Sequence, residues 1–313
     1  MVAIISDEKQ LSSLPEGIDY VKIHSPTSGI EPMTALKLNR EKFDVVFSPM
    51  QTMGSIGRKF KLILTIHDLI YFNHPKPPSE FNLIIRLIWR LYHLSYLPQK
   101  LLLRGADQVV TVSETSKAQI LSKKLTKRPV TVVSNAANQL DSNNCPVEKK
   151  IVYMGSFMPY KNVEQLILGT AKLDGFKLVL LSRIGISQKT QYQKLALQHG
   201  VDIEFLNGVS DEEYARQLCS ATALVHASSD EGFGIPIIEA MSVGCPVVCS
   251  DIPIFREIAG EAGLYFNPGD ADGFASQVMK ASEQREQMRS KLVSQANSFN
   301  WETSADALRR LLF

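Results

Sequence analysis

Residues 226–251, which read HASSDEGFGIPIIEAMSVGCPVVCSD, decide the fold of this chain. The apolar run 223–227 predicts a buried strand, and the polar turn 228–230 follows its end. A helix is expected to begin at Ile235-Pro236, because proline suits the first helical turn, where its missing N–H costs nothing. Gly244 stands where this helix should end, and the run 246–249 predicts the next buried strand. The stretch is therefore a strand, a glycine loop, a helix and a second strand.

The glycine loop of this unit predicts a ligand site. It consists of Gly232, Phe233 and Gly234, with a carboxylate on each side, Glu231 and Glu239. Glycine lets a backbone approach a ligand closely, and the start of a helix offers N–H groups and a positive dipole end. We therefore expect the loop to hold a phosphate or a sugar hydroxyl.

The same alternation of strands and helices fills the rest of the chain. Apolar runs predict strands at 2–6, 20–23, 43–47, 62–66, 108–112 and 130–133, and again at 151–154, 176–181, 203–206 and 264–266. Helical patterns between them predict one parallel sheet in each half, with helices on both faces. Residues 139–150 are polar and aperiodic, which is typical of a linker. We expect two Rossmann-like domains, 1–140 and 146–296, and a C-terminal helix over 297–313 that packs back on the first domain.

Ligands of parallel sheets bind at the carboxyl ends of the strands. With two such domains the expected site is the cleft between them. The residues that follow the predicted strands, and that we expect to point into this cleft, are His67, Asp68, Ser113, Asn135, Gly155, Arg183, Gly208 and Glu231.

Composition excludes several other classes. The chain has 313 residues and a net charge of +2, which is too small to argue for nucleic-acid binding. Its four cysteines are not spaced as metal ligands. Residues 1–10 do not have the pattern of a signal peptide, and no apolar run reaches the length of a membrane span. A cytoplasmic protein is the default expectation.

Several motifs then resemble one enzyme family. The segment from Glu231 to Glu239, EGFGIPIIE, resembles the glutamate-x7-glutamate motif of retaining glycosyltransferases of family 4. Segments similar to other family signatures are YMGSFMPYKN at 153–162, FLNGVSDEE at 205–213, residues 250–258, TIHDL at 65–69 and ADQVVTVS at 106–113. The resemblance covers roughly residues 43–313. It implies the GT-B fold, in which two Rossmann-like domains face each other across a cleft.

The resemblance also implies a reaction. A sugar would pass, with retention and without a metal or further cofactor, from a nucleotide-diphosphate-sugar to an acceptor hydroxyl in surface polysaccharide or glycolipid synthesis. The form of segment 155–162 is most similar to members that use mannosyl or rhamnosyl donors. The catalytic residues would be Glu231 at the sugar hydroxyls, His67 near the transferred sugar and Lys161 at the diphosphate. The donor-binding residues would be Glu239 at the ribose, with Gly232, Phe233, Gly234, Gly155, Ser156, Arg183 and Gly208.

Two features depart from the family pattern. Ser156 stands where many members carry an arginine, and Arg183 is the candidate replacement for that charge. Residues 1–19 contain no glycine-rich loop, so the first domain is expected to lack the family's first strand and loop. One alternative is therefore a non-catalytic or partner-dependent subunit, within a homo- or hetero-oligomer. A sugar-nucleotide epimerase of the same architecture is a second alternative.

Three further residues and one helix have interpretations of their own. Ser113 is expected to cap a helix, His226 to be a packed strand histidine, and Asn162 to cap a helix with Gln165 three residues on. In the helical pattern 81–103, which Pro98 should break, basic and apolar residues are interleaved, and the basic residues continue in the stretch 81–104. We prefer packing of this helix on its own sheet, with arginines reaching water; contact with an anionic membrane is the alternative.

Overall fold

The structure is a computed structural model that describes residues 1–26, 28–77, 82–138, 140 and 145–313. The chain divides into two compact units, Met1–Val133 with Leu311–Phe313, and Ser134–Arg310. Of the predicted linker 139–150, residues 139 and 141–144 lie outside the described part of the chain. In the first unit Lys61 Nζ donates to the Leu311 carbonyl at 2.7 Å, which ties down the last residues.

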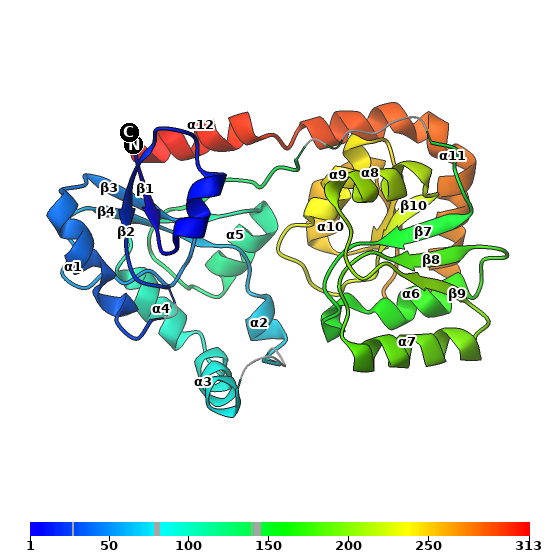
Figure 1. Ribbon diagram of the computed structural model, residues 1–313, viewed down its shortest axis with the longest axis horizontal. Helices are drawn as coiled ribbons and strands as arrows, with labels where there is room; N and C mark the ends of the chain where they lie inside the picture. The colour runs from blue at the N-terminus through cyan, green and yellow to red at the C-terminus, as the bar shows by residue number, and fades with distance from the viewer. Residues whose placement is uncertain (27, 78–81, 139, 141–144) are drawn as a thin grey trace. The chain divides into compact units, whose positions relative to one another are not determined.

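Four parallel strands form the main sheet of the first unit (Figure 1). In their hydrogen-bonded order they are β3 (Val45–Ser48), β4 (Lys61–Ile66), β5 (Gln108–Thr111) and β6 (Val130–Val132). Residues Leu62 to Ile66 of β4 are buried, as an unbroken apolar run predicts for an inner parallel strand. Because the strands run the same way, their carboxyl ends gather at one edge, and His67 directly follows β4.

The first two strands do not join this sheet. β1 (Val2–Ile5) and β2 (Asp19–Lys22) pair in parallel with each other as a separate two-stranded sheet. The prediction of one sheet in this half is therefore wrong, although Ile4 and Val21 pack against the same hydrophobic core. A short apolar run marks a strand, but its pairing partner is fixed by distant segments that the run does not reveal.

The predicted helix over 81–103 is two helices. α3 spans Leu83–His93 and α4 spans Leu97–Arg104; residue 81 lies outside the described residues. The chain breaks before Pro98, which lies in the first turn of α4, where it leaves no hydrogen bond unmade. The other helices of the unit are η1 (Glu8–Ser13), η2 (Glu31–Met33), α1 (Thr34–Leu38), η3 (Asn39–Glu41), α2 (Ile70–Asn73) and α5 (Glu114–Ser122).

A six-stranded parallel sheet forms the second unit, in the order β12-β11-β10-β7-β8-β9. Its strands are β7 (Lys150–Tyr153), β8 (Lys177–Leu180), β9 (Asp202–Phe205), β10 (Ala223–His226), β11 (Val247–Ser250) and β12 (Leu264–Phe266). β7 and β10 are neighbours at the middle of the sheet, although some seventy residues separate them. The loops that follow these two strands therefore meet, and they carry the predicted site residues.

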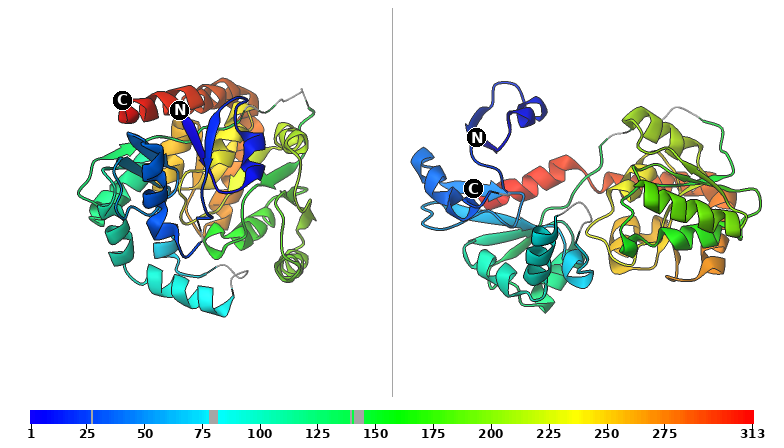
Figure 2. Two further views of the ribbon diagram at one scale, coloured as in Figure 1. Left: turned by 60° about the vertical axis from the view of Figure 1, so that its left-hand side comes forward. Right: turned by 60° about the horizontal axis from the view of Figure 1, so that its bottom comes forward.

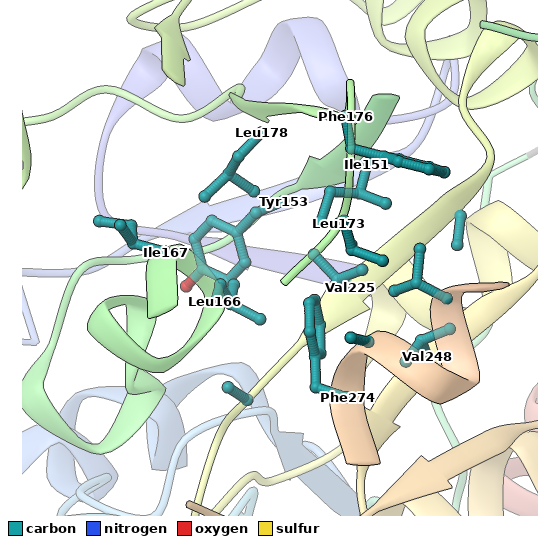
Figure 3. Close-up of a cluster of buried hydrophobic side chains, with 14 of the residues drawn as sticks. Ile151, Tyr153, Leu166, Ile167, Leu173, Phe176, Leu178, Val225, Val248 and Phe274 are labelled. Atoms are coloured by element: carbon teal, nitrogen blue, oxygen red, sulfur yellow. The ribbon is translucent and has the colours of Figure 1, made fainter. Parts of the chain in front are cut away.

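The core of the second unit lies between this sheet and its helices. Tyr153, Leu178, Val225 and Val248 of the strands pack with Phe274 of α11 (Figure 3). The helices and 3-10 turns are η4 (Pro159–Lys161), α6 (Val163–Thr170), α7 (Ile186–Gln198), α8 (Asp211–Ser220), α9 (Ile235–Ser242), α10 (Pro253–Ala259), η5 (Gly260–Ala262), α11 (Ala271–Asn297) and α12 (Trp301–Leu312). Within the described ranges, no helix is long and apolar enough to cross a lipid bilayer.

Candidate functional site

The loops after β7 and β10 are hydrogen-bonded to each other. The Ser229 N–H donates to the Tyr160 carbonyl at 2.8 Å, and Asn162 Nδ2 donates to the Ala227 carbonyl at 3.1 Å. Asn162 is the N-cap residue of α6, as predicted, but its side chain makes no cap hydrogen bond, so the predicted cap by this side chain is wrong. Asn162 itself adopts a left-handed conformation with φ of 49°. These bonds hold the end of η4 against the glycine loop.

Lys161 and Glu231 come together at this junction as an ion pair. The Lys161 ammonium donates to Glu231 Oε1, and Ser228 Oγ donates to the same oxygen at 2.9 Å. About a tenth of each charged side chain is exposed, 11% for the lysine and 10% for the glutamate. Lys161 Nζ also lies 5.2 Å from the centre of the Tyr160 ring. A cation held at the carboxyl ends of parallel strands is suited to bind an anionic ligand.

The glycine loop leads from Glu231 into α9 as predicted. Gly234 has φ of 113°, which a residue with a side chain rarely adopts, and Pro236 lies in the first turn of the helix. The Phe233 ring contacts the edge of Phe299, the residue between α11 and α12, at a centroid distance of 5.7 Å. The loop conformation is thus supported by a residue distant in sequence.

Glu239 lies one turn into α9 and is partly buried. Burial raises the pKa of its carboxyl, and the polar Tyr214 hydroxyl nearby opposes part of that rise. A carboxylate in this position can accept hydrogen bonds from a pair of ligand hydroxyls. No sequence pattern singles out Tyr214, because a tyrosine within a helix is usually a core residue.

Gly155 and Ser156 lie in the loop after β7. The Gly155 N–H donates to Ser182 Oγ at 2.9 Å, and the Tyr153 hydroxyl donates to the Ser156 carbonyl at 2.5 Å. A Cβ added to Gly155 would lie 2.8 Å from the Tyr153 hydroxyl. The glycine is thus required by the buried tyrosine that fastens the loop.

Arg183 and Gly208 lie together at the ends of β8 and β9. Gly208 has φ of 100°, and a Cβ there would meet Arg183 Cγ at 2.9 Å. The Arg183 side chain therefore lies against the glycine backbone, and the residue is exposed. That Arg183 supplies the charge missing at Ser156 stays a prediction.

His226, at the end of β10, is the buried histidine of this site. It is 4% exposed, and neither ring nitrogen has a hydrogen-bond partner in the described part of the chain. Its ring contacts Tyr153 and Phe255 at centroid distances of 5.2 and 5.9 Å. Burial, and then the charge of Lys161, lower the pKa of His226 to about 3. The residue is therefore neutral at physiological pH, as expected of a packed strand histidine.

His67 belongs to the first unit, where it follows β4. Its Nε2 lies 2.8 Å from the Pro49 carbonyl, an acceptor only, so this nitrogen carries the proton. The His67 carbonyl accepts from Ser116 Oγ at 3.1 Å, and Ser113 caps α5 as predicted. The imidazole is exposed and leaves Nδ1 as an acceptor when neutral. That His67 meets the donor across a cleft stays a prediction.

Most of the chain matches two family models of glycosyltransferases. Residues 138–299 match the family model of the glycosyl transferases group 1, and residues 26–139 match that of glycosyltransferase family 4. The chain is 31% identical to the O-antigen chain mannosyltransferase RfbU of Salmonella typhimurium over 224 residues, which cover 69% of this chain and 59% of that protein. It is 27% identical to O-antigen chain mannosyltransferase B of Escherichia coli, over 77% of this chain and 67% of that protein. The chain thus spans about three fifths to two thirds of these relatives.

Solved structures resemble the chain along almost its whole length. HepE of Anabaena, in a complex with UDP and glucose, has a TM-score of 0.75 at 14% identity, covering 99% of this chain and 91% of HepE. Sucrose-phosphate synthase of Thermosynechococcus elongatus has a TM-score of 0.73 at 19% identity, covering 99% and 87%. At these identities the likeness shows the fold, and it confirms the predicted GT-B fold. The family matches confirm the predicted resemblance to family 4 glycosyltransferases.

Proposed function

Because this chain belongs to the glycosyl transferases group 1 family, we propose that it is a retaining, metal-independent hexosyltransferase. It moves a sugar from a nucleotide-diphosphate-sugar to an acceptor hydroxyl. The observation that carries the proposal is the ion pair of Lys161 and Glu231 beside the glycine loop. It joins a cation for the diphosphate and a carboxylate for the sugar in one place.

Lys161 is placed to stabilise the negative charge that develops on the leaving group during the reaction. As the bond from the anomeric carbon to the phosphate oxygen breaks, negative charge builds on the leaving diphosphate. The Lys161 ammonium has three donors, so it can turn from Glu231 toward the phosphate without leaving its buried position. Glu231, no longer fully engaged by the lysine, then accepts hydrogen bonds from the sugar hydroxyls.

Retention requires the acceptor to attack the anomeric carbon from the same face from which the leaving group departs. The new bond forms between the acceptor oxygen and the anomeric carbon, and the bond to the phosphate oxygen breaks. The hydroxyl proton passes to the departing phosphate oxygen, which is the base nearest to it on that face. His67 acts at the transferred sugar, while Glu239 holds the ribose hydroxyls of the donor. Gly155, Ser156, Arg183, Gly208 and the glycine loop 232–234 complete the donor site.

The proposed donor sugar is mannose or rhamnose. Two relatives bear the name of mannosyltransferase in O-antigen chain synthesis, which supports this class of donor and a glycan as acceptor. The acceptor is a sugar or a lipid-linked glycan, so the protein works in the cytoplasm, peripherally on the inner face of a membrane. Cys245 and Cys249 are buried free thiols, which suits a reducing compartment.

A panel of nucleotide diphosphates and nucleotide-sugars tests the donor site through thermal shifts. A ligand present at ten times its Kd should add about 1.4 kcal/mol to the free energy of unfolding. Lys161→Ala should abolish this shift and the turnover of the donor. Lys172→Ala is the matched control, because Lys172 Nζ pairs with exposed Asp272 at 3.2 Å elsewhere in the unit. Wild-type donor turnover by Lys161→Ala would refute the assignment.

The reaction type has its own measurement. NMR of the glycoside should show the anomeric configuration of the donor sugar, and turnover should persist in excess EDTA. An inverted product, or loss of turnover that added metal restores, would contradict retention or metal independence.

A second candidate is a subunit that needs another polypeptide, as a homo- or hetero-oligomer. The separate pair β1–β2 favours it, because these strands pack on the core of the first unit without joining its sheet. Light scattering combined with turnover by the isolated chain separates the two candidates. A monomer that transfers the sugar unaided excludes the second.

A further inference from the structure

The outer face of α3 is apolar and exposed. Six side chains from Leu83 to Leu94 are each more than half exposed: Leu83 (80%), Ile84 (72%), Leu87 (58%), Ile88 (60%), Leu91 (57%) and Leu94 (75%). At 100° per residue they fall within one continuous sector of the helix. Leu97 and Leu101 of α4, exposed by 58% and 51%, continue the apolar surface. These eight residues are called the leucine face below.

The opposite side of α3 is fixed by aromatic packing. Trp89 meets Tyr71 of α2 edge to face at 5.2 Å, and His93 lies 4.9 Å from Phe72 of the same helix. The Tyr92 hydroxyl donates to Gln99 Oε1 at 2.7 Å, which joins α3 to α4. The aromatic side of the helix is thus the one that faces its own unit. The preferred interpretation from sequence, packing of the apolar residues on the sheet, is wrong for the leucine face.

The figures agree with this arrangement. α3 stands out from the strands of its unit (Figure 1), and the left view of Figure 2 shows the same separation from a second direction.

The charged residues of α3 and α4 have one sign. From Asn82 to Ala106 the sequence contains no aspartate or glutamate, but it contains Arg86, Arg90, Lys100 and Arg104. Arg86 and Arg90 are four residues apart, so they follow one line along α3. That line borders the sector of Leu83 and Leu87. An apolar stripe bordered by arginines is the pattern of a helix that lies in the plane of a membrane surface.

We propose that the leucine face docks on an anionic phospholipid surface. The aliphatic side chains enter the boundary of the acyl chains, and the arginines reach lipid phosphates through their long stems. A second copy of the chain is a poorer occupant, because two such faces would bring basic residues against basic residues. The inference rests on the membrane location included in the proposed function and adds the surface that makes the contact.

Sedimentation with lipid vesicles tests the docking without any donor, so it can succeed or fail apart from the glycosyltransferase assignment. The protein should bind vesicles of mixed phosphatidylcholine and phosphatidylglycerol, and bind vesicles of phosphatidylcholine alone more weakly. Ile88→Glu should weaken partition by about tenfold or more, because it removes an inserted side chain and adds a like charge. Arg90→Gln should weaken it about fivefold, which corresponds to about 1 kcal/mol for one basic residue at the surface.

Leu197→Glu is the matched control, because Leu197 is also an exposed leucine, 83% exposed, but lies in the last turn of α7 in the second unit. It should bind the mixed vesicles as the wild type does. Circular dichroism should show that Ile88→Glu keeps its fold, since Ile88 contacts solvent. Equal loss in both glutamate variants, or wild-type binding by Ile88→Glu, would overturn the proposal. So would a wild-type dimer in light scattering that Ile88→Glu converts to a monomer without change in vesicle binding.

Discussion

Lys161 and Glu231 form a nearly buried ion pair that joins the loops after two neighbouring strands, β7 and β10. Ser228 Oγ donates a second hydrogen bond to Glu231 Oε1 at 2.9 Å. Removal of two charges from water costs free energy that their attraction recovers only when both partners are present. The pair is therefore expected to contribute both to the stability of the fold and to donor binding. Substitutions of the two residues can separate these contributions.

Single substitutions of the pair should destabilise the fold more than the double substitution does. Lys161→Met leaves the Glu231 carboxylate without its cation, and Glu231→Gln leaves the ammonium without its anion. Each should lower the free energy of unfolding by about 3 kcal/mol, the lower end of the range for buried pairs, because a tenth of each side chain is exposed. The double variant should be more stable than either single variant by at least about 2 kcal/mol. Urea denaturation measures all three.

Donor binding gives the complementary readout for this pair. All three variants should lose the thermal shift with nucleotide-sugars, because Lys161→Met removes the cation for the diphosphate and Glu231→Gln removes the carboxylate for the sugar hydroxyls. Lys177→Met is the control, because Lys177 and Glu204 form an exposed pair at 3.4 Å. It should change stability by less than about 1 kcal/mol. Additive losses in the double variant would contradict a coupled pair.

His226 should make the fold sensitive to acid. Its pKa is about 3 in the folded protein, against about 6.5 for an unperturbed histidine. Between these values the unfolded chain binds a proton that the folded chain does not, so stability falls as pH falls. The slope should approach about 1.4 kcal/mol per pH unit. His226→Phe, which keeps a ring between Tyr153 and Phe255, should remove this contribution.

The difference between the wild type and the variant isolates His226 from the other histidines. Denaturation at several pH values from 7 down to about 4 should show the two curves diverging below the ordinary histidine pKa. His199→Phe is the matched control, since His199 is exposed after α7, and it should leave the pH dependence unchanged. Parallel curves for the wild type and His226→Phe would rule out the mechanism.

Sequence patterns predicted local features of this protein better than distant contacts. Every apolar run from Val2 to Phe266 that is predicted to be a strand is a strand. The signal is most continuous in β4, β7, β10 and β11, because these strands are buried on both faces. The separation of β1–β2 from β3 was missed, since pairing depends on segments far apart in the chain. The break between α3 and α4 was placed at Pro98 instead of before it, since proline is also compatible with a first helical turn.

The candidate site was predictable as a set of residues and less so as a set of contacts. Glu231, Lys161 and Gly155 stand in recognisable motifs, but no motif shows that Glu231 pairs with Lys161. Asn162 was expected to cap α6, and its amide instead binds the Ala227 carbonyl. A cap and a bond between loops require the same residue type, so spacing alone does not distinguish them.

Gly155 should not accept even one additional methyl group. A Cβ there would lie 2.8 Å from the Tyr153 hydroxyl and 3.2 Å from the ring carbon that bears it. Tyr153 is fully buried and donates to the Ser156 carbonyl at 2.5 Å, so it has little room to move. Gly155→Ala should therefore lower the free energy of unfolding by about 1–3 kcal/mol, as overpacking does in cores. It should also weaken donor binding, because the Gly155-Ser156 loop shifts.

Two further variants show whether the clash is the cause. Tyr153→Phe combined with Gly155→Ala removes the nearest clashing atom and should recover part of the stability lost by Gly155→Ala alone. Gly29→Ala is the control, because a Cβ at Gly29 meets nothing within 4 Å and the φ of Gly29 lies outside the left-handed region. That variant should be neutral or more stable by about 0.4–1 kcal/mol, since alanine reduces the freedom of the unfolded chain. If Gly155→Ala behaves like Gly29→Ala, the loop is not fastened by Tyr153.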